Sequence, residues 1–115
     1  MTLNEALKIY ALNDGQISQF EFDFRSKKLN IKLLVRKHIT KQSFEPCEMM
    51  LTFHDVKLFD IFEDFPTYGQ YSDITIFENE TDGVYVSFDP YRNSGIAHED
   101  DNWIIKAEQI TINEL

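Results

Sequence analysis

Apolar side chains occupy every second position in two consecutive stretches near the start of the chain. Phenylalanines stand at positions 20, 22 and 24, and aliphatic residues stand at 29, 31, 33 and 35, with mostly polar residues between them. Alternation with a period of two is typical of a β-strand that buries one face. The two stretches therefore predict a hairpin that turns at Ser26-Lys27.

The register of this hairpin follows from keeping every apolar side chain on one face. It contains three apolar pairs, namely Phe24–Leu29, Phe22–Ile31 and Phe20–Leu33. The same register sets Glu21 opposite Lys32 on the other face, where opposite charges stabilise a strand pair. A shift by one residue would turn the phenylalanines toward solvent, so we expect this register to be strongly favoured.

A short amphipathic helix is predicted at the N-terminus. Thr2 and Glu5 form a capping box, in which each side chain accepts a hydrogen bond from a backbone N–H at the helix start. The apolar residues that follow have helical spacing: Leu3, Ala6, Leu7 and Tyr10. We expect the helix to end at Asn13-Asp14-Gly15, because glycine adopts the left-handed conformation of a C-terminal cap.

The apolar period changes between residues 47 and 65. The segment from Cys47 to Phe53 alternates like a third strand, whereas the next apolar residues are spaced like one face of a helix: Leu58, Ile61, Phe62 and Phe65. We expect a short helix over residues 55–65, with Asp55 as its N-cap. The alternative is that the strand continues through this segment.

A second hairpin is predicted between residues 74 and 88. Apolar residues stand at even positions on both sides of its turn: Ile74, Ile76, Val84, Val86 and Phe88. A loop of Thr81-Asp82-Gly83, with the glycine left-handed, pairs Ile76 with Phe88 and keeps the apolar face intact. After a polar loop over residues 90–102, a last strand begins at Trp103 and changes phase near Glu108-Gln109, which indicates a bulge.

These elements together predict the α+β class: about six mostly antiparallel strands, an N-terminal helix and a short central helix. The four glycines and three prolines all fall at boundaries of the expected elements, which argues against a flexible linker. We therefore expect residues 1–115 to form a single globular domain.

Composition excludes several classes of protein. One cysteine among 115 residues rules out an internal disulfide framework and a zinc site built from several thiolates. No apolar stretch approaches the length of a membrane span and the N-terminus lacks a secretion signal, so we expect a soluble, cytoplasmic protein without membrane contact. The net charge of −9 disfavours binding to nucleic acid.

The charge is distributed unevenly along the chain. Residues 1–57 carry nine basic and seven acidic side chains, a balance of +2, whereas residues 58–115 carry two basic and thirteen acidic side chains, a balance of −11. The window from Phe24 to Phe44 contains no acid, and we call its basic residues the basic stripe: Arg25, Lys27, Lys28, Lys32, Arg36, Lys37 and Lys41. The stripe is either a strand face whose charges are paired within the fold or a docking surface.

Motifs that bind phosphate or activate a nucleophile are absent from the sequence. No two glycines lie within six residues of each other, which excludes glycine-rich phosphate loops. Cys47 has the core phase of its strand and is expected to be a small buried residue. His54 beside Asp55 has no serine or cysteine placed for activation, and His98-Glu99-Asp100-Asp101 lacks the spacing of a calcium loop. We expect no catalytic residue, no cofactor and no metal site.

Three short segments have a familiar pattern: Asp14-Gly15-x-Ile17, Leu51-Thr52-Phe53-His54-Asp55-Val56 and Ser87-Phe88-Asp89-Pro90-Tyr91. With the hairpin of alternating phenylalanines and aliphatic residues, they resemble small, largely uncharacterised bacterial domains, several of which are grouped with immunity proteins of polymorphic toxin systems. The resemblance touches about half of the chain and contains no catalytic motif. It implies a cytoplasmic, non-enzymatic protein that binds and neutralises a cognate toxin, often a basic nuclease.

The favoured hypothesis is a protein-binding module that contacts a basic protein through its acidic half, because acids interleaved with tyrosines are suited to such an interface. The expected contact residues are Asp60, Glu63, Asp64, Tyr68, Tyr71, Glu78, Glu80, Asp82, Tyr85, Tyr91, Glu99, Asp100 and Asp101. Two alternatives stay open. An oligomerising structural subunit would set the basic stripe against the acidic face of a second copy. A small-ligand or enzymatic domain would hold His54 and His98 in one polar pocket.

Overall fold

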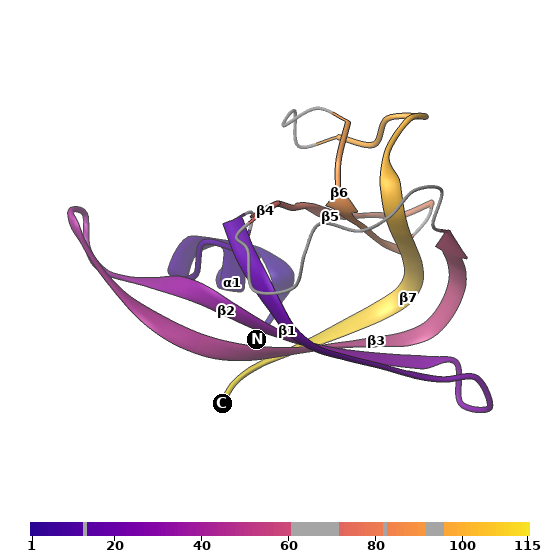
Figure 1. The fold of residues 1–115 in the computed structure, drawn as a ribbon, viewed down its shortest axis with the longest axis horizontal. Helices are drawn as coiled ribbons and strands as arrows, with labels where there is room; N and C mark the ends of the chain where they lie inside the picture. Colours follow the sequence, from indigo (N-terminus) through magenta and orange to yellow (C-terminus); the bar gives the residue numbers. More distant parts are fainter. Residues whose placement is uncertain (13, 61–71, 82, 92–95) are drawn as a thin grey trace.

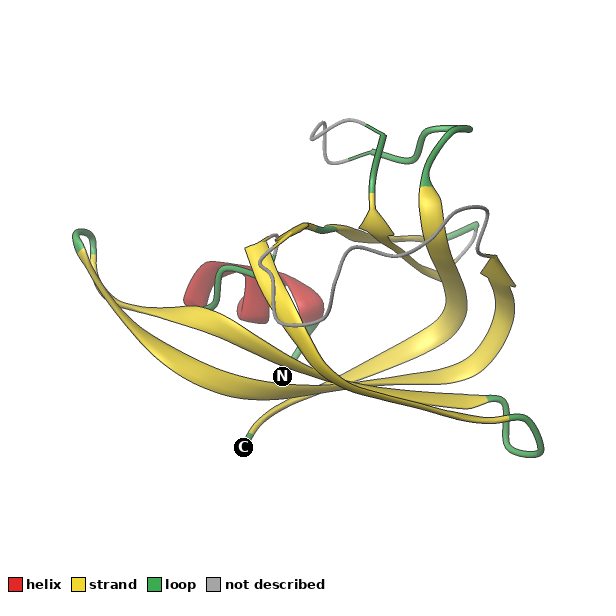
Figure 2. Cartoon of the chain, in the orientation of Figure 1, coloured by secondary structure: helices red, strands yellow, loops and turns green. Residues whose placement is uncertain are grey.

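The structure is a computed structural model that describes residues 1–12, 14–60, 72–81, 83–91 and 96–115. Its elements, shown in Figures 1 and 2, are α1 (Leu3–Ile9), β1 (Asp14–Asp23), β2 (Lys28–Thr40), β3 (Ser43–Asp60), β4 (Ser72–Asp73), β5 (Thr75–Asn79), β6 (Gly83–Asp89) and β7 (Asn102–Glu114). Among these described residues, no helix has the length and apolar character that a membrane crossing requires.

The strands form one antiparallel sheet in the order β4-β1-β2-β3-β7-β6-β5. The two end strands of the sheet, β4 and β5, are separated along the chain by a single residue. β4 pairs with β1, whereas β5 pairs with β6. The sheet is therefore strongly curved, and Figure 2 shows α1, β4, β5 and β6 on the same side of the long β1, β2, β3 and β7 strands.

The core lies on the inner side of this curved sheet. Every second residue of the central strands is buried there, as the alternation predicts, and the largest fully buried side chains include Phe53, Phe88, Leu33 and Ile105. Leu3 and Ala6 of α1 and Tyr10 just after it close the core from the helix side. Burial of apolar area at about 25 cal/mol per Å² makes this cluster the main source of stability.

The N-terminal helix forms as predicted but ends earlier. The capping box is present, with the Glu5 N–H donating to Thr2 Oγ1 at 3.1 Å. The helix ends at Ile9 with Tyr10 as its C-cap, rather than at the glycine. Gly15 belongs to β1, where a Cβ atom would lie close to the side chains of Val35 in β2 and of Ile74 between β4 and β5.

The first hairpin has the predicted faces but a different register. Phe22 pairs with Leu29 and Phe20 pairs with Ile31, so residues 24–27 form the turn and Phe24 is 85% exposed. The Asp23 carboxylate accepts hydrogen bonds from the backbone N–H groups of residues 25 and 26, which stabilises this longer turn. The shift is two residues, so the apolar side chains stay on one face.

This new register also changes the expected charge pair. Glu21 lies opposite Asn30 instead of Lys32, and Lys32 pairs with Gln19 across the strands. A register irregularity between Ile17 and Gln19 changes which positions of β1 face the core. Positions 15 and 17 face it before the irregularity, and Phe20 and Phe22 face it afterwards.

The expected central helix is wrong for residues 55–60, because β3 continues to Asp60. Two backbone features produce the change of apolar period: Asp55 has a left-handed backbone with φ of +53°, and the register with β7 shifts between Val56 and Leu58. A bulge moves side chains to the other face of a strand, which imitates helical spacing in the sequence. Residues 61–65 of the expected helix lie outside the described part.

The second hairpin has the predicted loop length, displaced by one residue. β5 ends at Asn79 and β6 begins at Gly83, so Ile76 pairs with Val86 rather than with Phe88. Gly83 has the expected left-handed backbone, with φ of +73°. The bulge expected near Glu108-Gln109 of β7 lies instead in β3, at the register shift opposite Ala107.

Candidate functional site

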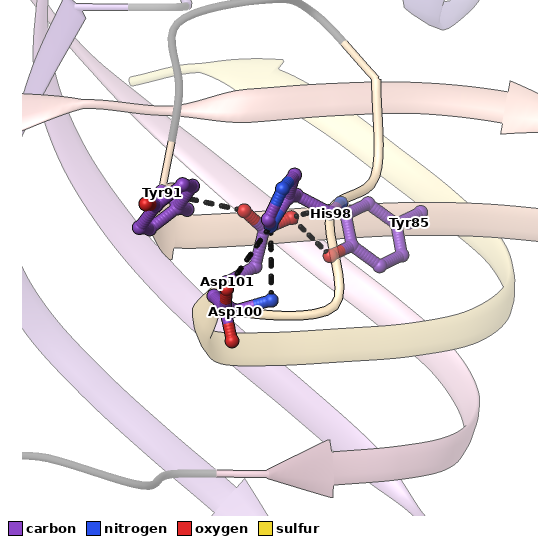
Figure 3. Close-up of polar contacts among 5 residues, drawn as sticks. All are labelled: Tyr85, Tyr91, His98, Asp100 and Asp101. Carbon is purple, nitrogen blue, oxygen red and sulfur yellow. Dashed lines mark hydrogen bonds and ion pairs between the residues drawn. The ribbon is translucent and has the colours of Figure 1, made fainter.

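A buried carboxylate organises the loop that connects β6 to β7. Asp101 is fully buried and accepts three hydrogen bonds: from the Tyr85 hydroxyl at 2.6 Å, the Tyr91 backbone N–H at 2.9 Å and the His98 backbone N–H at 2.9 Å. Figure 3 shows these donors converging on the two oxygens of Asp101. Three donors compensate for the removal of a carboxylate from water, so Asp101 holds the described parts of the loop, at Tyr91 and at His98, from within.

A tight turn from His98 to Asp101 holds the second half of this loop. The Asp101 N–H donates to the His98 carbonyl at 3.0 Å, and the Asp100 N–H donates to His98 Nδ1 at 3.1 Å. The His98 ring stacks on the Tyr91 ring, with centroids 4.5 Å apart and planes inclined by 21°. Tyr91 is thereby held at both its backbone and its ring.

Tyr85 lies beneath the loop on the outer face of β6. It is 4% exposed, and its ring stacks on Phe77 of β5 at 5.0 Å. Burial raises the pKa of Tyr85 well above that of an ordinary phenol, and the hydrogen bond to Asp101 raises it further. Tyr85 therefore stays protonated and serves as a donor to Asp101.

The outward side of the loop combines exposed apolar and acidic side chains. Tyr91 and Ile96 are 59% and 66% exposed, and Glu99 and Asp100 of the turn are also exposed. Two half-buried acids lie at strand ends near the start of β7. Asp60 is the last residue of β3 and pairs with residue 104, and Asp89 is the last residue of β6 and pairs with residue 102. We call Tyr91, Ile96, Glu99 and Asp100 the loop surface.

The expected contact residues do not all belong to this surface. Tyr85 and Asp101 are buried against each other, which corrects their assignment to an exposed face. Glu78 and Glu80 are exposed at the opposite end of the β5–β6 hairpin, beside its turn. The remaining expected contacts, Glu63, Asp64, Tyr68, Tyr71 and Asp82, lie outside the described residues.

The structure does not bring the two candidate histidines together. His54 lies in β3 opposite Gln109 and contacts Thr111 Oγ1 at 2.8 Å, whereas His98 lies in the loop before β7 begins. Within the described ranges, no three histidine, cysteine or acidic side chains are grouped as metal ligands. Burial raises the pKa of the Cys47 thiol, and the nearby Glu114 carboxylate raises it further, which disfavours the reactive thiolate.

Three members of the basic stripe form ion pairs within the molecule. Lys32 contacts Glu48 at 3.3 Å, Lys37 contacts Glu114 at 3.0 Å, and Arg36 contacts Asp14. The stripe is therefore partly neutralised by the fold itself, in agreement with a strand face whose charges are paired.

Comparisons with protein-family models, with curated proteins and with solved structures found no match. The assignment of a function therefore depends on the geometry of the loop surface.

The sequence pattern did not distinguish Asp101 from the exposed acids beside it, and it did not indicate Ile96. One signal was present: Tyr85 and Ser87 alternate with the core residues of β6, so their face of the strand needed a cover. The apolar phase alone does not say which loop supplies that cover.

Proposed function

We propose that this protein is a non-enzymatic binding module that captures a basic protein through the loop surface. The observation that carries the proposal is Tyr91, an exposed aromatic side chain whose backbone N–H is bonded to buried Asp101 and whose ring is stacked on His98. Aromatic anchors that are ordered before binding lose little conformational entropy on association.

The charge around this anchor supports a cationic partner. Glu99 and Asp100 are exposed next to the anchor, and Asp60 and Asp89 lie at strand ends near the start of β7. The chain as a whole carries a net charge of −9. Complementary charge accelerates encounter with a basic protein and lowers the affinity for acidic ones.

We further propose that the partner is a basic toxin, such as a nuclease, which this protein would inhibit. The support is the sequence resemblance to immunity-type domains together with the acidic loop surface. Inhibition would follow if the loop surface covered the cationic groups that such a toxin uses to hold a polyanionic substrate.

The test is capture of partners from the native lysate at low and at high salt, with identification by mass spectrometry. We expect one dominant basic protein at low salt and its loss at high salt. Tyr91→Ala, and separately the double variant Glu99→Gln with Asp100→Asn, should remove it from the captured set.

Two matched controls distinguish the loop surface from general acidity or exposure. Glu78→Gln with Glu80→Gln removes the same charge at the opposite end of the β5–β6 hairpin, and Phe44→Ala removes another exposed aromatic ring. Both controls should retain the partner. Equal capture by all four variants would contradict the proposal.

A further inference from the structure

A separate hollow lies where the β1–β2 turn meets the irregular part of β3. Its volume is about 670 Å³, within the range of about 300–1,000 Å³ that is typical of small-molecule sites. Phe22 and Phe24 line one side, and Asp55, Val56 and Lys57 line another. This hollow contains no member of the loop surface.

The aromatic side of the hollow is the exposed end of a larger cluster of rings. The Phe24 and Phe22 rings meet edge to face at 4.7 Å, and Phe22 also contacts Phe59 at 5.9 Å. Phe59 in turn contacts Phe20 and Trp103. The inner rings pack against the core, whereas Phe24 is 85% exposed, so a large apolar surface is left facing the hollow. A further aromatic ring would extend this cluster.

The backbone beside the hollow is held in an unusual conformation. Lys27 and Asp55 both have left-handed backbones, with φ of +54° and +53°, although neither is glycine. The Val56 N–H donates to the Lys27 carbonyl at 2.9 Å and joins the turn to β3. Left-handed non-glycine residues are costly and often occur where side chains must be placed for binding.

The charges around the hollow fall into two groups. Lys57 and Glu108 form an ion pair at 3.7 Å and neutralise each other. Lys27 and Asp55 also line the hollow, and neither forms an ion pair within the described part of the chain. The lining therefore presents one cation and one anion beside an aromatic wall.

We propose that this hollow binds a zwitterionic aromatic ligand, in which a carboxylate faces Lys27, an ammonium group faces Asp55 and an aromatic ring packs on Phe24. A free aromatic amino acid and a short aromatic peptide both have this chemistry. This site is independent of the proposed capture of a basic protein, and either can fail without the other.

The test is a titration of ¹⁵N-labelled protein with L-phenylalanine, followed by the amide chemical shifts of residues 24, 27, 56 and 57. We expect saturable shifts at these positions. Phenylacetate lacks the ammonium group and phenethylamine lacks the carboxylate, so each should bind about tenfold more weakly, the loss of one charge-assisted contact. The dipeptide Ala-Phe distinguishes a short peptide from a free amino acid as the ligand. Tighter binding than phenylalanine assigns the site to a peptide, and weaker binding assigns it to the free amino acid.

The variants can be chosen to preserve the fold. Asparagine tolerates a left-handed backbone, so Lys27→Asn and Asp55→Asn remove one charge each without new strain. Lys27→Asn should bind phenylalanine and phenethylamine equally, because the ligand carboxylate has lost its partner. Asp55→Asn should bind phenylalanine and phenylacetate equally, because the ammonium group has lost its partner. Phe24→Ala should abolish the shifts. Lys41→Asn and Glu45→Gln in the β2–β3 hairpin are the matched controls and should bind like the wild type. The proposal is overturned if no saturable shift occurs, or if the Lys27 and Asp55 variants bind like the controls.

Discussion

Gly83 is the residue at which the second hairpin depends most on the absence of a side chain. Its φ is +73°, and a Cβ atom there would lie 2.5 Å from the backbone carbonyl oxygen of Ala107. Gly15 is different, because its added Cβ would meet the ends of the Val35 and Ile74 side chains at 3.2 and 3.3 Å. Side-chain ends can move, whereas a paired backbone carbonyl cannot.

We therefore predict that Gly83→Ala lowers the free energy of unfolding by about 2 kcal/mol or more, from left-handed strain together with the contact to β7. Gly15→Ala should cost clearly less. Urea unfolding of both variants measures the difference, and equal losses would contradict this account of Gly83.

Asp101 gives a second prediction at the scale of single residues. Tyr85→Phe removes one buried donor to Asp101 and should cost about 1–2 kcal/mol of unfolding free energy. Asp101→Asn should cost more, because its NH2 group would face one of the two backbone N–H donors, Tyr91 or His98, whichever way the amide is turned.

The matched control for Asp101→Asn is Asp100→Asn, whose side chain is 62% exposed and which should change stability by about 0.5 kcal/mol or less. Urea unfolding measures all three variants. If Asp101→Asn proved as mild as Asp100→Asn, the buried carboxylate would not be what fixes the loop.

At the scale of elements, Glu114 connects the end of β7 to two other parts of the fold. Its carboxylate contacts Lys37 of β2 at 3.0 Å and accepts a hydrogen bond from the Tyr10 hydroxyl at 3.1 Å. The Lys37 side chain, and then the Tyr10 hydroxyl, lower the pKa of Glu114. A carboxylate with a lowered pKa stabilises the folded state above its unfolded pKa, and this contribution is lost as the pH falls through the folded value.

We predict that Glu114→Gln is less stable than the wild type at neutral pH and that the difference disappears as the pH is lowered below about 4, the ordinary range of glutamate. Urea unfolding across this pH range measures it. In a Lys37→Met background the pH-dependent difference should shrink, because the larger cause of the shift is gone. A difference that is constant with pH would contradict this assignment.

The elements also show what alternation in the sequence could and could not predict. Phe20, Phe22 and their aliphatic partners identified the first hairpin and its buried face, because a period of two leaves few other solutions. The period did not fix the turn, since the Asp23 side chain favours a register two residues away with the same faces. At Asp55, a left-handed residue and a bulge imitate a helix, because sequence spacing records side-chain direction and not its cause.

At the scale of the whole molecule, the sequence pattern could not predict the order of the strands or the strong curvature of the sheet. The curvature depends on the long-range pairing of β4 with β1, made by the segment that leads directly into the local β5–β6 hairpin. The sequence shows the uneven charge, and among the described residues the fold places Glu99 and Asp100 on the loop surface but Glu78 and Glu80 at the opposite end of the β5–β6 hairpin. The candidate site could be predicted only in part: Tyr91, Glu99 and Asp100 lie on it, whereas Tyr85 and Asp101 support it from inside.

The most direct measurement of the central claim is calorimetry, over a range of salt, of the affinity with which the basic protein expected from the capture experiment binds the wild type and two variants. Tyr91→Ala should weaken binding at least about tenfold with an unchanged salt dependence, because it removes an uncharged anchor. Glu99→Gln with Asp100→Asn should weaken binding at low salt and flatten its salt dependence. Wild-type affinity and salt dependence in both variants would contradict the claim that the loop surface binds the partner.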